Sequence, residues 1–441
     1  MSTTYERYKD PDVWPLLIED KGKFEEWLVV ERVTAAVFEK HELIPVGLWE
    51  ALARIEITDD VIRRIQDREE TTGHDLQSFL DVTREILIAM GCGDLAPYLH
   101  LGLTSYDTED TATARLLKRV LDILISRHQR LADIVLKQAA LYKETLQIGR
   151  THGMHAEPIT FAFKLLIWYD KVDYLIKELR RLKGVVGVGK ISGVVGVYTI
   201  EPSLEKEICE QLGLKAAKIS TQILPRRIHA TYAFTLILAA QEFACIAEEI
   251  RNLQRPEIAE VQEAFRKGQV GSSAMKHKRN PVRCENVSSL GKHLRGEIQA
   301  FLANIITWGE RDLSNSAAER LALGEISNLL GFMILRMQGV IDGLVVNPER
   351  MIENLNLSHG VVYSQNVLLQ LRGKGMEAAV AERLIQELSF EAIDTKTSFK
   401  ELLLANEAIS GYLSAEEVEA SFDPWKNNLR YIGEIYARFG L

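Results

Sequence analysis

The sequence predicts an all-α fold in which a central bundle of long helices is shared between subunits. No proline falls between residues 98 and 157, and apolar residues recur there at helical spacing over 117–142. Residues 165–179 and 287–308 repeat a 4,3 spacing of apolar side chains, which is typical of amphipathic helices. Residues 232–253 are apolar nearly all round, which indicates a helix enclosed by neighbours.

Proline and glycine divide the chain into three predicted helical domains. Residues 1–103 contain several proline and glycine interruptions, which favours a separate N-terminal helical domain. The long helices define a central domain over 104–347, and short amphipathic segments over 348–441 indicate a C-terminal helical domain. One domain cannot easily bury so many long helices, so we expect a homo-oligomer whose subunits share the bundle.

Composition restricts the classes of partner and the compartment. The formal net charge is −9, so the surface as a whole repels polyanions and we expect no nucleic-acid binding. The apolar run over 232–247 is interrupted by Gln241 and Glu242 and is too short to span a bilayer, so we expect no membrane partner. The N-terminal residues lack the apolar run of a signal peptide, and the four cysteines form no CxxC pair. These features predict a cytoplasmic protein in a reducing compartment.

Two segments allow more than one interpretation. The glycine-rich residues 184–196 fit neither GxGxxG nor a Walker loop, so a flexible turn or short hairpin is favoured over phosphate binding. The segment RTHGMHAEP, residues 150–158, carries two histidines before a long helix. These could form a metal pair, but no further ligands follow, which favours an acid/base imidazole at a helix start.

Residues 271–281, GSSAMKHKRNP, combine paired serines with a run of cations. A solvated basic loop is the simpler interpretation of such a run. The alternative is an anion site, because neighbouring positive charge favours a deprotonated oxygen and binds carboxylates.

This segment resembles the signature of the fumarase/aspartase superfamily, and the wider chain resembles its adenylosuccinate lyase branch. The motifs that carry the likeness are RTHGMHAEP, HLGLTSYDTEDTA, KISGVVGVY, KISTQILPRRIHA and WGERDLSNSAAER. The resemblance runs from about Glu6 to the C-terminus. It implies purine biosynthesis: β-elimination of fumarate from adenylosuccinate, giving AMP, and from succinylaminoimidazole carboxamide ribotide. It also implies a homotetramer whose active sites are each formed by three subunits.

The resemblance implies roles for individual residues. Ser272 is expected to remove the Cβ proton and His152 to protonate the leaving nitrogen. Lys278 is expected to stabilise the intermediate, and Glu285 to orient the histidine. Substrate binding is implied for Arg7, Tyr8, His74, Asp75, His100, Thr104, Ser105, Thr151, Gln222, Ser273, Asn280, Arg311, Ser316 and Arg320. The substrate is a small anionic nucleotide, and neither a cofactor nor a metal is expected.

Two departures from the family pattern leave room for other functions. The family usually has proline at Lys276 and arginine at Gly73, so the signature loop loses a fixed φ and a possible anion contact is lost. His155 and His277 lie inside motifs and could act in loop hydrogen bonding or in catalysis. The alternatives are another fumarate-releasing lyase such as argininosuccinate lyase, a carboxymuconate cycloisomerase, or a relative that has lost the chemistry.

Overall fold

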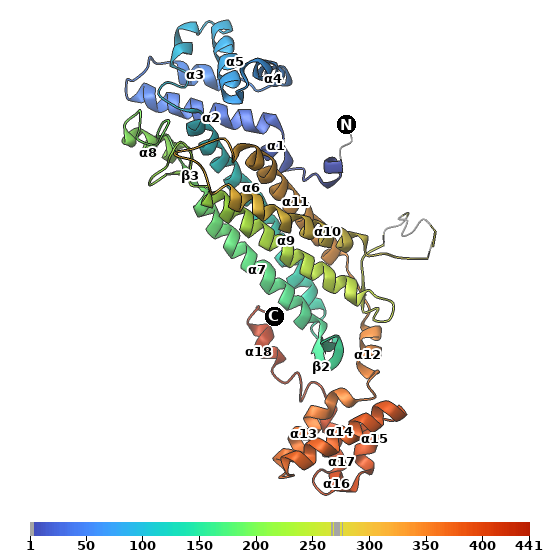
Figure 1. The fold of residues 1–441 in the computed structure, drawn as a ribbon. Coiled ribbons are helices and arrows are strands. Elements are labelled where there is room, and N and C mark those ends of the chain that lie inside the picture. The colour runs from blue at the N-terminus through green and yellow to red at the C-terminus, as the bar shows by residue number, and fades with distance from the viewer. Residues whose placement is uncertain (1–3, 266–267, 269–273, 276) are drawn as a thin grey trace. The chain divides into compact units, whose positions relative to one another are not determined.

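The computed structural model describes residues 4–265, 268, 274–275 and 277–441 (Figure 1). The described residues are mostly helical, with three two-stranded sheets. Unit 1 comprises residues 1–130, 173–245 and 286–337, and unit 2 comprises residues 131–172, 246–285 and 338–441. The three predicted domains, bounded near residues 103 and 347, remain a prediction.

Unit 1 begins with short helices packed around an aromatic core. The rings of Phe24, Trp27 and Phe79 lie with centroids 5.4–6.0 Å apart. Thr58 caps α4 by accepting a hydrogen bond from the backbone N–H of Val61. The elements are η1 (Thr4–Tyr8), α1 (Trp14–Leu17), α2 (Asp20–Lys40), α3 (Leu48–Ala53), α4 (Asp59–Thr72), α5 (Asp75–Ala89) and η2 (Gly93–Tyr98).

Five long helices confirm the periodicity of the sequence, and each contributes residues to both units. In unit 1 they pack closely: the Tyr232 hydroxyl of α9 lies 2.7 Å from the Ser327 hydroxyl of α11. Helix α9 has the length and composition of a membrane span, but 61% of its most apolar window is buried, as in the core helix of a globular protein. The long helices are α6 (Ser105–Leu141), α7 (Phe161–Val186), α9 (Arg227–Leu253), α10 (Val282–Ala303) and α11 (Ser316–Asp342). Helix α10 ends before the predicted positions Ile305 and Trp308, which are exposed.

The C-terminal part of unit 2 consists of short helices, as predicted. Val367, Leu371, Phe399 and Leu403 are fully buried in its core. Strand β5 (Val261–Gln262) pairs antiparallel with β6 (Val345–Val346) just before this region. Its elements are α12 (Pro348–Asn356), η3 (Val361–Tyr363), α13 (Ser364–Gly373), α14 (Ala378–Thr395), α15 (Phe399–Ala405), α16 (Glu407–Ser410), α17 (Ala415–Ser421) and α18 (Ile432–Ala437).

Two segments differ from the sequence prediction. RTHGMHAEP lies in an antiparallel hairpin of β1 (Leu146–Thr151) and β2 (Met154–Thr160), not at a helix start. The glycine-rich segment forms no hairpin of its own. Its strand β3 (Val188–Gly189) instead pairs in parallel with β4 (Lys215–Ala216), and α8 (Pro202–Gln211) connects the two strands.

Candidate active site

His152 occupies the tip of the β1–β2 hairpin in unit 2. Thr151 and Met154 are paired across the hairpin, so His152 and Gly153 form its two-residue turn. Their φ angles are 54° and 77°, and positive φ at both central positions is the conformation of a type I′ turn. The His152 side chain is exposed. The turn therefore presents the imidazole, with Thr151 beside it, at the end of a short ribbon.

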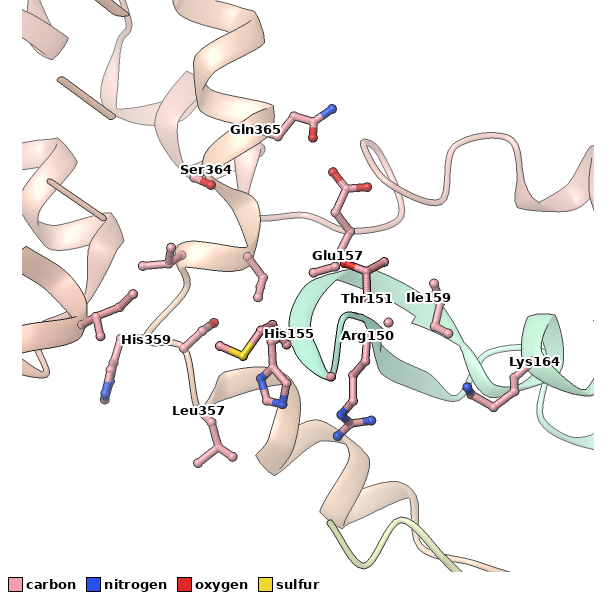
Figure 2. A pocket seen from close by; sticks show the side chains of 18 of the residues that line it. Arg150, Thr151, His155, Glu157, Ile159, Lys164, Leu357, His359, Ser364 and Gln365 are labelled. Carbon is pink, nitrogen blue, oxygen red and sulfur yellow. The ribbon is translucent and has the colours of Figure 1, made fainter. Parts of the chain in front are cut away.

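A cavity of about 1140 Å³ lies along this hairpin, within unit 2. Figure 2 shows Thr151, His155 and Glu157 on one wall, and Ser364 and Gln365 of α13 on the other. Burial and the neighbouring Arg150 guanidinium lower the pKa of His155. The lowered pKa favours the neutral form of His155, which can accept a hydrogen bond.

The signature segment is described only in part. Ser272 and Ser273, predicted to remove the proton and to bind substrate, lie outside the described residues. Lys278 is exposed, Asn280 is partly buried, and Glu285 is exposed in the first turn of α10. These three residues belong to unit 2, as do Thr151 and His152.

The Glu263 carboxylate anchors the downstream end of this segment. It accepts the backbone N–H of Arg283 at 3.2 Å and of Cys284 at 2.7 Å. Gln254 accepts the N–H of Glu263 at 3.0 Å and donates to the carbonyl of Arg279 at 3.0 Å. Gln254 and Glu263 thereby connect Arg279 to the N-terminus of α10. The free N–H groups of this helix end stabilise the Glu263 carboxylate.

In unit 1, other side chains hold each of two predicted substrate-binding arginines in place. The Arg311 guanidinium lies 3.7 Å from the centroid of the Tyr106 ring and donates to Gln222 Oε1 at 3.0 Å. Arg320 Nη2 lies 2.9 Å from Asp75 Oδ2. The structure therefore brings Gln222 to Arg311 and Asp75 to Arg320, with planar cations suited to phosphate or carboxylate groups.

Arg320 and Ser316 line a cavity of about 320 Å³ together with Tyr106 and Glu109. Burial and the nearby Asp75 carboxylate raise the pKa of Glu109 to about 8. Burial and Glu109 raise the pKa of Tyr106 to about 12. At neutral pH both side chains are therefore mostly protonated and can donate hydrogen bonds.

The sequence interpretation did not single out Tyr106 or Glu109. With Asp110 and Thr113 they follow the i, i+3, i+4, i+7 spacing of one helix face, and all four line the same cavity. The polar face that these four residues form on an otherwise amphipathic core helix was the signal in the sequence that could have identified Tyr106 and Glu109.

The Asp107 carboxylate organises the segment that contains Thr104 and Ser105. It accepts the N–H of Thr104 at 2.8 Å and of Ser192 at 3.0 Å, and it pairs with Lys190. Both members of the ion pair are fully buried. Asp107 thus joins the predicted substrate-binding residues to the glycine-rich segment, which the sequence analysis interpreted as a flexible turn or short hairpin.

His100 is fixed by a buried carboxylate. Its Nδ1 lies 2.7 Å from Oε1 of Glu31, and its φ is 64°. Burial opposes the charged imidazole, but the charge and hydrogen bond of Glu31 outweigh it and raise the pKa of His100. The Glu31 carboxylate thus favours the protonated imidazole of His100 near the start of the Thr104 segment.

The remaining predicted residues lie on other elements of unit 1. His74 caps α5, accepting the N–H of Gln77 at its Nδ1. Gly73, where the family usually has arginine, has φ 63° and ends α4, a position that favours glycine. Tyr8 packs its ring against Phe332 at 5.5 Å, and Arg7 is exposed beside it in η1.

One group among the described residues has metal-ligand chemistry. His293 and Glu297 on α10 and Glu325 on α11 place ligand atoms within 4.8 Å of one another. His293 Nε2 lies 2.5 Å from Glu325 Oε1, so these two side chains contact each other directly through a hydrogen bond.

Comparison with known proteins identifies the family. Residues 23–296 match the family described as "Lyase", and residues 360–439 match "Adenylosuccinate lyase C-terminus". The fold is similar to a fumarate lyase from Mesorhizobium sp. BNC1, with a TM-score of 0.85 and 23% identity over 95% of this chain and 94% of that chain. It is also similar to 3-carboxy-cis,cis-muconate lactonizing enzyme from Pseudomonas putida, with a TM-score of 0.85 and 25% identity over 96% and 94%.

The sequence is 39% identical over 437 residues to adenylosuccinate lyase of Bacillus subtilis (strain 168), covering 99% of both chains. This likeness extends through the hairpin, the signature segment and the C-terminal helices alike. The chain therefore belongs to the adenylosuccinate lyase family.

Proposed function

We propose that this enzyme cleaves adenylosuccinate to fumarate and AMP, and succinylaminoimidazole carboxamide ribotide to fumarate and the corresponding carboxamide in purine biosynthesis. The observation that carries the proposal is the 39% identity to an adenylosuccinate lyase over 99% of both chains. The match of residues 360–439 to the adenylosuccinate lyase C-terminus favours this substrate over those of other fumarate-releasing lyases.

The proposed chemistry is a β-elimination. Ser272, as its alkoxide, takes the proton from Cβ of the succinyl group, and the electron pair moves into the adjacent carboxylate. Lys278 and Asn280 stabilise this aci-carboxylate by charge and hydrogen bonding, which contributes about 3 kcal/mol per donor in comparable sites. The electron pair then forms the double bond of fumarate as the C–N bond breaks. His152 protonates the leaving nitrogen, and Glu285 orients the His152 imidazole. This route uses side chains alone, without metal or cofactor.

Substrate binding is assigned to the remaining predicted residues. Arg311, Ser316 and Arg320 supply donors for a phosphate or carboxylate, and Asp75 and Gln222 hold the two arginines in place. The other proposed contacts are Arg7, Tyr8, His74, His100, Thr104, Ser105, Thr151 and Ser273. A phosphate and two carboxylates need several such cations and donors on a chain whose net charge is −9.

We further propose a homotetramer in which three subunits form each active site. Large apolar side chains are exposed on the helices and connections of unit 1: Phe234, Leu302, Ile306, Trp308 and Leu321 are 50–82% exposed. Exposed apolar surface of this kind is typical of a subunit interface. The four cysteines are free, which fits the proposed cytoplasmic location.

Fumarate release tests the substrate directly. Purified enzyme is mixed with adenylosuccinate, argininosuccinate or a carboxymuconate, and turnover is followed by absorbance. We expect turnover of adenylosuccinate alone. If the folded enzyme cleaves only another of these substrates, the proposed function is wrong and that substrate replaces adenylosuccinate. If it cleaves none of them, the protein is better explained as a relative that has lost the chemistry. Ser272→Ala should lower kcat by several orders of magnitude while substrate still binds.

His152→Asn separates the chemical role of His152 from its place in the turn. Asparagine favours the first central position of a type I′ turn before glycine, so the hairpin should form as well as in the wild type. Its amide cannot donate a proton to the leaving nitrogen, so kcat should fall by roughly 10²–10⁴-fold. Wild-type kcat in a folded His152→Asn enzyme would remove the acid role from His152.

A further inference from the structure

A buried carboxylate, Glu260, helps to tie the β1–β2 hairpin to the rest of unit 2. Glu260 is fully buried, and Arg150 donates to both of its oxygens, at 3.1 Å from Nη1 and 2.6 Å from Nη2. Gln147 Nε2 donates to Oε2 at 2.6 Å. Asn354 Nδ2 of α12 donates to Oε1 at 2.8 Å. Glu260 therefore bonds two residues of strand β1 and one of α12.

A β-bulge in the hairpin lies between the two residues of β1 that bond Glu260. The register shifts between Ile148 and Arg150, where Gly149 of β1 lies opposite two residues of β2, Ala156 and Glu157. A Cβ at Gly149 would lie 2.9 Å from the Glu157 carbonyl oxygen. Glycine thus allows the bulge of β2 to approach β1 closely, between the two donors to Glu260.

The contacts keep Glu260 charged despite its burial. Burial alone would raise its pKa, but the hydrogen bonds from Arg150, Asn354 and Gln147 outweigh this and lower the pKa. A charged, four-bonded carboxylate restricts the direction of the strand more than a single neutral hydrogen bond does. Arg150 is two residues from His152, so this restriction acts directly below the turn.

We propose that Glu260 is a positioning residue for the reaction: through Arg150 and Gln147 it fixes the orientation in which the hairpin presents His152. The proposal rests on the acid role of His152 in the proposed function. Glu260 touches the strand and not the tip, so it acts through the hairpin. Misplacement of a reacting group by about 1 Å can cost roughly 100-fold in rate.

The test compares Glu260→Gln with a matched control in the full-length enzyme. Glu260→Gln should lower kcat on adenylosuccinate by about 10–100-fold and change KM by less than about 3-fold, because substrate contacts remain. The control is Glu26→Gln. Glu26 is a buried carboxylate in unit 1 that pairs with Arg115 and Arg119, and its loss should leave kcat unchanged.

A second comparison separates positioning from general loss of structure. In a His152→Asn background the acid is already absent, so adding Glu260→Gln should lower kcat no further. Arg150→Met should reproduce the kcat loss of Glu260→Gln, and the two together should cost little more than either alone. Additive losses in the His152→Asn background would overturn the proposal.

Amide hydrogen exchange gives a readout that does not depend on turnover. Glu260→Gln, or Arg150→Met if the former does not fold, should raise exchange at least 10-fold in residues 147–159. Glu26→Gln should leave exchange there unchanged. Unchanged exchange in the hairpin refutes the inference whether or not the enzyme is active. If wild-type enzyme leaves adenylosuccinate intact while the hairpin loosens as expected, the proposed function fails and the structural role of Glu260 stands.

Discussion

The Asp107–Lys190 pair should be the most sensitive electrostatic contact in unit 1. Both side chains are fully buried, and the carboxylate also accepts backbone N–H groups of Thr104, Ser192 and Gly193. Asp107→Asn preserves the shape but leaves the Lys190 ammonium buried without a counter-charge. Breaking a buried ion pair in this way lowers the free energy of unfolding by about 3–5 kcal/mol. This corresponds to a fall in Tm of roughly 3–5 °C for a chain of 441 residues.

The assay is thermal unfolding followed by circular dichroism at one protein concentration, since Tm of an oligomer depends on concentration. Lys190→Met added to Asp107→Asn should recover much of the loss, because no isolated charge remains. The matched control is Asp122→Asn, which breaks the largely exposed Asp122–Lys183 pair and should cost about 1 kcal/mol or less. A loss below about 1 kcal/mol for Asp107→Asn would refute the reasoning.

Three further predictions test separate features. The pKa of Glu109 is about 8 in the native state, compared with its ordinary value of 4.5 in an unfolded chain. The unfolded state therefore loses this proton at lower pH than the native state, and the wild-type free energy of unfolding should decrease from about pH 4.5 to pH 8. Urea titrations should therefore find Glu109→Gln increasingly stabilised over the wild type across that range, and a constant difference would contradict the pKa. Tyr106→Leu removes the ring beneath Arg311 and should raise KM by roughly 5–30-fold, as expected for about 1–2 kcal/mol; an unchanged KM would exclude this role. Gly149→Ala should lower Tm through its backbone clash, whereas Gly184→Ala, in open space on α7, should raise it; equal effects would contradict the bulge argument.

Periodicity predicted the long helices because each buries a continuous apolar stripe. Val120, Leu124, Leu131 and Val135 of α6 are fully buried, so the spacing in the sequence translates directly into packing. The same rule failed beyond Ala303, where the apolar pattern continues but the helix does not. An apolar pattern marks surface that needs covering, and it does not distinguish a helix from an apolar connection.

The hairpin over 146–160 escaped prediction for a related reason. Its strands show no clean alternation of apolar and polar residues, and the bulge opposite Gly149 adds a residue to β2. The His-Gly pair that makes the turn is also weaker evidence for a hairpin than Asn-Gly. The local sequence therefore favoured a helix start at RTHGMHAEP, and the hairpin follows only from pairing between the two strands.

The candidate site was predictable where a motif carried it, and unpredictable where it depends on distant contacts. Resemblance supplied His152 and Arg311, but the residues that hold them lie far away in sequence. Glu260 is separated from Arg150 by 110 positions, and Gln222 from Arg311 by 89. Such pairs follow from the assembled fold and have no local signature.

Two of the predicted site histidines adopt a conformation that their local sequence does not favour. His100 and His152 have φ values of 64° and 54°, in the left-handed region that costs most residues about 1–2 kcal/mol. Each is held from outside its own turn: Glu31 contacts His100 directly, and Glu260 bonds Arg150 beside His152. Glycine or asparagine would relieve both positions, but neither provides an imidazole. Buried carboxylates thus help the fold to keep imidazoles in a backbone conformation that few residues favour.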